Sequence, residues 1–145
     1  MSEALYNTRI LRLAASIPHQ VRLDQPQASL TRVSPVCGSK ITVDIDLDHH
    51  GRVARFGQYV RACALGQASA SILGTRILGL TPAELATARD ALAVYLRDDS
   101  AALPADWSPL ELFAPARPHK ARHPSILLAF DAAAAAAAAA AGKKE

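Results

Sequence analysis

The chain has 145 residues, half of them hydrophobic and 5% aromatic, with a formal net charge of +3. This length suits one domain with a modest core of aliphatic side chains rather than two domains. The small charge, and the scattering of Lys and Arg without interleaved aromatic residues, argue against nucleic-acid binding. Two cysteines and no apolar leader predict a reducing, cytoplasmic environment. The alanine run 132–141 is too short to predict a membrane span, so we expect a soluble protein.

Hydrophobic periodicity in the first half of the chain predicts one helix and three strands. A helix is expected over residues 4–17. A polar stretch with isolated apolar residues predicts an edge strand over 25–34. Residues 41–48 alternate between apolar and polar side chains, which indicates a strand with one buried face. A turn at 49–51 leads into a strand over 52–60, and the two strands are expected to form an antiparallel hairpin.

The second half of the chain predicts helices around a proline-rich segment. A helix rich in small residues is expected over residues 63–78. Thr81-Pro82-Ala83-Glu84 is a capping box that starts a further helix, which stops near Asp98. Five of the nine prolines fall within residues 102–124, so we expect a loop there, with one short turn at 110–113.

A last helix is expected to start at Pro124-Ser125 and to continue into the alanine run, because alanine is the best helix former. We assign no specific contact to its far end. The order of elements predicts an α+β fold, a three-stranded antiparallel sheet with helices packed on one side. We expect one domain over residues 1–131 and an alanine-rich helical or frayed tail over 132–145.

Two motifs contain the only cysteines of the chain. Cys37 lies in Pro35-Val36-Cys37-Gly38, and Cys63 opens a helical segment that ends in Ala-Ser-Ala-Ser at residues 68–71. These motifs resemble those of the IscU, SufU and NifU N-terminal family of iron–sulfur cluster assembly scaffolds, which read roughly Pro-x-Cys-Gly-Asp and Gly-Cys-x-x-x-x-Ala-Ser-x-Ser. The resemblance extends over residues 6–130. It is greatest to the SufU branch, which has a long insertion before its last motif.

The resemblance implies a metal or cluster site whose usual ligands are three cysteines and one further residue, often an aspartate. Cys37 and Cys63 match the first two cysteines. Ser39 stands where the family has the aspartate, and Ser125 stands at the third cysteine position. Zinc and iron–sulfur clusters take about four ligands and favour thiolates, so two serines leave a conventional site incomplete.

Three interpretations of this incomplete site remain open. His119 or His123 replaces a missing ligand, since imidazole suits zinc or iron. Alternatively, Cys37 and Cys63 hold a labile metal, complete a site with a partner, or accept persulfide sulfur. In the third interpretation the fold is kept as an adaptor that binds a partner without metal. A purely structural explanation of these residues is the alternative to all three interpretations. In it, each free cysteine packs as a small hydrophobic residue and Ser125 is a helix N-terminal residue.

The resemblance implies a scaffold-like role in iron–sulfur cluster assembly, with an iron–sulfur cluster or zinc as the bound species. The implied partners are a cysteine desulfurase and apo iron–sulfur acceptor proteins, with no nucleic acid or membrane partner. We do not expect an enzyme, because no phosphate loop, nucleophile elbow or His-Glu-x-x-His helix occurs. A thiol hydrolase that uses Cys63 is conceivable, but nothing around this residue supports it. Asp46, Asp48, His49 and His50 are metal-capable, but a polar hairpin tip explains them better.

Overall fold

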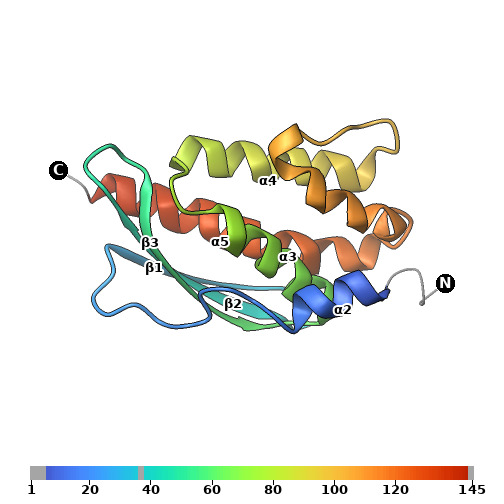
Figure 1. Cartoon of the computed structure of the whole chain (residues 1–145), viewed down its shortest axis with the longest axis horizontal. Helices are drawn as coiled ribbons and strands as arrows, with labels where there is room; N and C mark the ends of the chain where they lie inside the picture. The colour runs from blue at the N-terminus through green and yellow to red at the C-terminus, as the bar shows by residue number, and fades with distance from the viewer. Residues whose placement is uncertain (1–5, 36–37, 144–145) are drawn as a thin grey trace.

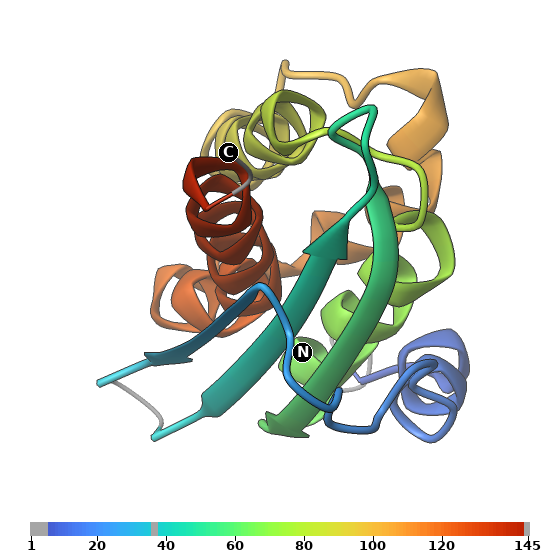
Figure 2. The same cartoon turned by 90° about the vertical axis from the view of Figure 1, so that its left-hand side faces the viewer.

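A three-stranded antiparallel sheet of order β1-β2-β3 forms one layer of the fold. The structure is a computed structural model, and it describes residues 6–35 and 38–143. The strands are β1 (Ala28–Val33), β2 (Lys40–Leu47) and β3 (Val53–Arg61). The α-helices pack on one side of this sheet (Figures 1 and 2). The predicted α+β fold class is therefore confirmed.

The helices form two further layers, in which the longest helix is central. The α-helices are α2 (Thr8–Ala14), α3 (Ala64–Arg76), α4 (Pro82–Arg97) and α5 (His123–Gly142), and the 3₁₀ helices are η1 (Ala105–Ala116) and η2 (Lys120–Arg122). Helix α5 contacts β1 and β2 on one side and α4 on the other. Figure 1 shows it running the length of the molecule between the sheet and α4. Helix α3 lies beside α5 and also contacts α2.

Strand β2 is buried on both faces, whereas its alternation predicted only one buried face. Its apolar residues face the helices, and its outer face is covered by the segment before β1. There the carboxylate of Asp44 accepts a 2.7 Å hydrogen bond from Nε of Arg22 and a 2.9 Å bond from the backbone N–H of Leu23. The backbone N–H of Gln27 donates to Asp46 at 2.7 Å. Polar residues of β2 thus anchor a covering segment instead of facing water.

The capping box of α4 is present as predicted. The hydroxyl of Thr81 accepts a 3.1 Å hydrogen bond from the backbone N–H of Glu84, and the Glu84 carboxylate accepts a 2.9 Å bond from the backbone N–H of Thr81. Pro82 occupies the first turn, where its missing N–H costs nothing.

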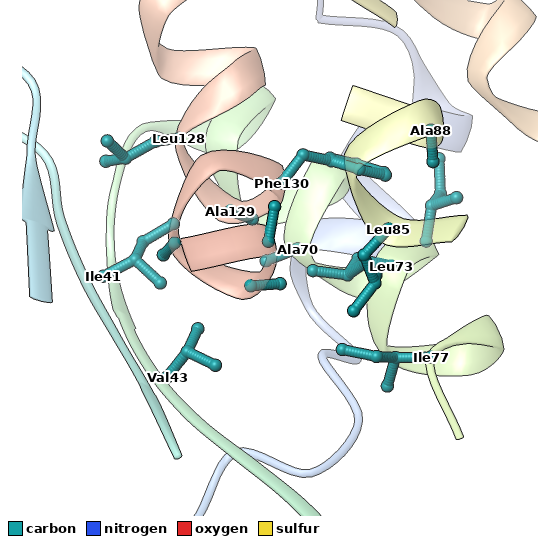
Figure 3. Packing of buried hydrophobic residues seen from close by; sticks show 14 of the residues in the cluster. Ile41, Val43, Ala70, Leu73, Ile77, Leu85, Ala88, Leu128, Ala129 and Phe130 are labelled. Atoms are coloured by element: carbon teal, nitrogen blue, oxygen red, sulfur yellow. The ribbon is translucent and has the colours of Figure 1, made fainter. Parts of the chain in front are cut away.

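The alanine segment of α5 lies in the core, whereas the sequence alone let us assign no contact to its far end. Six alanines of this segment are buried: Ala132, Ala133, Ala134, Ala136, Ala137 and Ala140. Small side chains let a helix approach both a sheet and another helix closely, which explains the choice of alanine. Larger residues fill the start of the helix, where Phe130 and other side chains meet α3, α4 and the sheet (Figure 3). In the described part of the chain one helical segment, Lys120–Gly142, is long and apolar enough to cross a membrane, but 61% of its apolar window is buried inside the fold.

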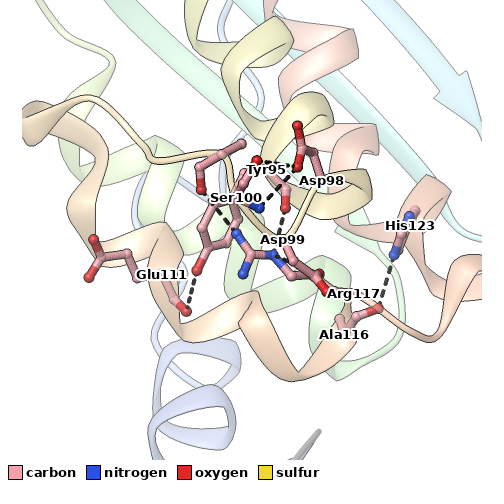
Figure 4. Close-up of polar contacts among 9 residues, drawn as sticks. Tyr95, Asp98, Asp99, Ser100, Glu111, Ala116, Arg117 and His123 are labelled. Carbon is pink, nitrogen blue, oxygen red and sulfur yellow. Dashed lines mark hydrogen bonds and ion pairs between the residues drawn. The ribbon is translucent and has the colours of Figure 1, made fainter.

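The prediction of a loop with a single short turn in the proline-rich segment is wrong, because this segment contains more regular structure. Helix η1 spans twelve residues and includes Pro109 and Pro115. Short 3₁₀ turns tolerate these prolines because they do not need the continuous hydrogen-bond ladder of an α-helix. Arg117 fixes the segment to α4, since its guanidinium lies 3.9 Å from the ring centroid of Tyr95 and its Nε donates to the Tyr95 carbonyl at 2.7 Å (Figure 4).

Candidate functional site

Cys63 occupies the N-cap position of α3, directly after the end of β3. Its backbone is extended, with φ −67° and ψ 171°, and its carbonyl accepts a 2.9 Å hydrogen bond from the N–H of Gln67. The side chain is partly buried and makes no capping hydrogen bond. The thiol therefore stands at the start of a helix, with part of its surface in contact with the core and part open to solvent.

The first cysteine, Cys37, lies outside the described residues, but the residues on both sides of it are anchored. The N–H of Ser34 donates to the carbonyl of Ser39, and the N–H of Gly38 donates to the carbonyl of Ser34, both at 2.8 Å. Gly38 has φ +71°, a left-handed conformation that glycine adopts without strain. These contacts close the connection between β1 and β2.

The sheet register places the C-terminal end of β1, the N-terminal end of β2 and Cys63 at the same end of the sheet. Lys40, the first residue of β2, pairs with Arg61, two residues before Cys63. Figure 2 shows the C-terminal end of β3 at this same end of the sheet. The two segments that carry the predicted cysteine ligands therefore start from neighbouring strands.

Ser125, which the resemblance predicts at the third cysteine position, lies in the first turn of α5 against the first turn of α3. A Cβ atom built on Gly66 would lie 3.1 Å from the Ser125 carbonyl oxygen and 2.9 Å from Cβ of Ala62. The Ser69 hydroxyl donates a 2.6 Å hydrogen bond to the carbonyl of Ile126. Ser125 itself is buried, as is Ser39. The structure thus brings the helix that Cys63 starts together with the segment that carries Ser125.

The two histidines proposed as substitute ligands differ in their surroundings. Nε2 of His123 lies 2.9 Å from the carbonyl oxygen of Ala116 (Figure 4). Because a carbonyl only accepts, Nε2 donates this hydrogen bond, and in the neutral form of the ring Nδ1 is then the nitrogen with a lone pair. His119 is exposed and precedes η2. Among residues 6–35 and 38–143, no three His, Cys, Asp or Glu side chains are grouped so that they could hold a metal ion.

The tip of the β2–β3 hairpin uses its metal-capable residues for structure. Asp48 accepts hydrogen bonds from the backbone N–H groups of Arg52 and His50, and these bonds hold its pKa below the ordinary value. Asp46 pairs with Arg55 at 2.8 Å. The rings of His49 and His50 lie 3.9 Å apart between centroids. These contacts favour the polar-tip interpretation over a metal site.

Two residues that shape this region, Gly66 and Ser69, were not predicted from the sequence. Gly66 permits the close approach of α3 and α5, and Ser69 supplies the side-chain bond between them. Both fall within the small-residue motif after Cys63. The small residues of this motif therefore indicated close helix packing, but we used the motif only to identify the family resemblance.

Among the solved structures that are similar to this chain over nearly its whole length are the following three. A crystal structure of a nitrogen-fixing NifU-like protein (N-terminal) from Brucella abortus is 37% identical, with 97% of each chain covered and a TM-score of 0.89. A protein from Fervidobacterium islandicum AW-1, assigned as an iron–sulfur cluster assembly scaffold for the SUF system, is 16% identical over 94% of this chain and 99% of its own, with a TM-score of 0.83. A hypothetical protein is 20% identical over 94% and 98% of the two chains, with a TM-score of 0.80. No protein-family model and no curated protein matches the sequence.

Proposed function

Because the chain belongs to the IscU/SufU/NifU-like family, we propose that it is a scaffold-like protein of iron–sulfur cluster assembly. The observation that carries the proposal is the match to a NifU-like N-terminal structure along nearly the entire chain. The fold shared with a SUF-system scaffold supports it. The resemblance inferred from the two cysteine motifs is confirmed at the level of this family, and its assignment to the SufU branch stays a prediction.

Cys37 and Cys63 are the proposed reactive groups. The common sheet edge from which their segments start supports this pairing. Thiolates are the ligands that iron, zinc and nascent clusters favour, and they are also the nucleophiles that accept sulfur. The proposed cargo is iron, a cluster, or sulfur on its way into a cluster.

The other side chains at the family's ligand positions do not complete a conventional site. Ser39 and Ser125 are buried, and serine is a poor ligand for iron or zinc. His123 is the proposed source of a third ligand through Nδ1. Without it, a partner protein supplies the remaining ligands, and the cysteine pair alone holds its cargo weakly.

Sulfur acceptance needs no metal ligand beyond the cysteines. In this step the Cys63 thiolate attacks the terminal sulfur of a cysteine persulfide on a donor protein. The new sulfur–sulfur bond forms while the donor's sulfur–sulfur bond breaks, and the donor cysteine leaves as a thiolate. No external oxidant or reductant is consumed. The proposed donor is a cysteine desulfurase, and the recipients are apo iron–sulfur proteins in a reducing cytoplasm.

A second candidate function is an adaptor that binds these partners without holding metal. The two serines at ligand positions favour it, together with the lack of a grouped His, Cys, Asp or Glu set in the described residues. The scaffold and the adaptor differ in one measurable property, since only the scaffold depends on its thiols.

The test measures iron, zinc and acid-labile sulfide in protein purified anaerobically and after reconstitution with iron and sulfide. Wild type is compared with Cys37→Ser/Cys63→Ser. A third variant, Ser125→Cys, restores the family's third thiol, and Ser108→Cys adds an exposed thiol in η1 as its control. Mass spectrometry after incubation with a desulfurase and cysteine detects persulfide on each variant.

The scaffold proposal expects metal or persulfide on the wild type, its loss in the double variant, and tighter iron retention in Ser125→Cys than in Ser108→Cys. Wild type that takes up neither metal nor sulfur, yet still binds the desulfurase, overturns the scaffold and leaves the adaptor. Equal gains in the two added-cysteine variants would contradict the placement of Ser125 at the site.

A further inference from the structure

A basic groove lies between α2, α3 and η1, away from Cys63. It has a volume of about 420 Å³, within the range of about 300–1,000 Å³ typical of ligand sites. Its lining combines the cations Arg9, Arg12 and Arg76 with the apolar side chains Leu13, Ile72 and Leu112. No carboxylate belongs to this lining.

Arg76 is held in place at the edge of the basic groove. Its Nε donates to the carbonyl of Asp106 at 2.9 Å, and its Nη1 donates to the hydroxyl of Thr75 at 3.1 Å. These bonds join the last turn of α3 to η1. A guanidinium that is already fixed loses little conformational entropy when it binds an anion.

None of the three arginines of the basic groove belongs to an ion pair of the described residues. The arginines that do form such pairs are Arg22, Arg52, Arg55, Arg89 and Arg117. Arg9 and Arg12 are exposed and stand three positions apart, so they share one face of α2. By contrast, a larger cavity of about 630 Å³ between α3, α4 and η1 contains Glu84 and Asp106 beside Arg76. Of these two cavities in the described part of the chain, the smaller one is lined by cations without carboxylates.

We propose that the basic groove binds an acidic peptide segment of a partner protein. Carboxylates of the segment would pair with the guanidinium groups, and one aliphatic side chain would cover Leu13, Ile72 and Leu112. Arginine suits this role because its planar donor fork matches a carboxylate. No aromatic ring lines the groove to stack on a nucleotide base, and a second copy of the chain would bring like charges together.

This surface is separate from the proposed cargo site. Helix α3 has 13 residues, with Cys63 before its first turn and Arg76 at its end, so the two residues lie about 20 Å apart along the axis. A partner held by an acidic segment in the basic groove would leave Cys63 accessible. The inference goes beyond the proposed function and does not depend on metal or sulfur binding.

The test uses fluorescence anisotropy with a short labelled peptide of alternating glutamate and leucine. Arg12→Glu is compared with Arg97→Glu, because both arginines are exposed and each lies in the last turn of its helix. Two control peptides replace glutamate by lysine or leucine by serine. Thermal melts establish that both variants fold, and amide chemical shifts of the ¹⁵N-labelled wild type locate the bound peptide.

We expect Arg12→Glu to raise the Kd of the glutamate–leucine peptide about tenfold or more and Arg97→Glu to change it little. Both control peptides should bind more weakly, and the shifted amides should lie in α2, the end of α3 and η1. Equal weakening by the two variants, or binding of inorganic triphosphate without binding of the peptide, overturns the proposal. The Cys37→Ser/Cys63→Ser protein should bind the peptide as the wild type does. A failure of the peptide-binding proposal can therefore be distinguished from a failure of the scaffold proposal.

Discussion

The Ser69 hydroxyl donates a 2.6 Å hydrogen bond to the carbonyl oxygen of Ile126, which lies 57 positions later in the chain. The bond joins the middle of α3 to the first turn of α5. One turn earlier in α3, Gly66 lies against the carbonyl of Ser125. The two helix starts that carry the predicted ligand positions Cys63 and Ser125 are therefore fixed relative to each other by a glycine contact and a side-chain bond.

Gly66→Ala should loosen this contact and lower the free energy of unfolding by about 1–2 kcal/mol. The added methyl group would lie 3.1 Å from a backbone oxygen of α5, which cannot move without its helix. Urea denaturation followed by circular dichroism measures the change.

The control for this substitution is Gly142→Ala, at the end of α5, where a built Cβ meets no atom within 4 Å. Its free energy of unfolding should stay equal or rise by less than about 1 kcal/mol, since alanine favours the helix more than glycine does. If the two variants had the same free energy of unfolding, the close approach at Gly66 would not contribute to stability.

Local signals in the sequence predicted the elements whose side chains follow a clear period or a capping motif. The alternation of β2 and the capping box of α4 are such cases, and both elements are present. The period could not reveal that the outer face of β2 is covered, because that depends on bonds from Arg22 and Leu23 to Asp44, about 20 residues apart in the chain. Long-range pairing of this kind leaves no local pattern.

The candidate site was predicted as a set of positions rather than as a geometry. The sequence identified Cys37, Cys63 and Ser125, while the structure adds the reason that Cys63 and Ser125 lie on adjoining helix starts. The alanines of α5 were misjudged for a related reason. A run of one residue type has no polar face and no apolar face, so it cannot show which side is buried.

Ala136→Leu should destabilise the protein by about 1–3 kcal/mol, because Ala136 is fully buried within the core and has no space for a larger side chain. Ala138→Leu is the matched control, since Ala138 is exposed on the same helix. It should change the free energy of unfolding by no more than about 0.5 kcal/mol. Equal effects of the two substitutions would show that the alanine segment does not pack as described.

Thr81→Ala should cost about 1 kcal/mol of stability, because it removes the hydroxyl that caps the N–H of Glu84. Thr87→Ala, at an exposed position inside α4, is the control and should be neutral or slightly stabilising. Thermal unfolding of the two variants measures the difference. A loss of stability at Thr87 as large as that at Thr81 would contradict a specific capping effect.

Asp44→Asn should remove stability at neutral pH and much less of it in acid. Burial alone would raise the pKa of Asp44, but hydrogen bonds from Arg22, Ser29 and the Leu23 N–H hold it below the ordinary value. A carboxylate with a lowered pKa in the folded state stabilises the fold above its unfolded pKa of about 3.9 and loses this contribution as the pH falls through its folded pKa. The variant lacks that charge at every pH.

Urea unfolding should therefore show wild type more stable than Asp44→Asn by about 1–3 kcal/mol at pH 7, with a gap that narrows below about pH 4. Asp24→Asn, at an exposed position in the same covering segment, should differ little from wild type across this range. Since Arg22 is 56% exposed, most of the effect at neutral pH should come from the buried carboxylate and its backbone bond to Leu23 rather than from the ion pair itself. A gap between wild type and Asp44→Asn that stays constant from pH 7 into acid would show that the carboxylate charge does not stabilise the covering segment.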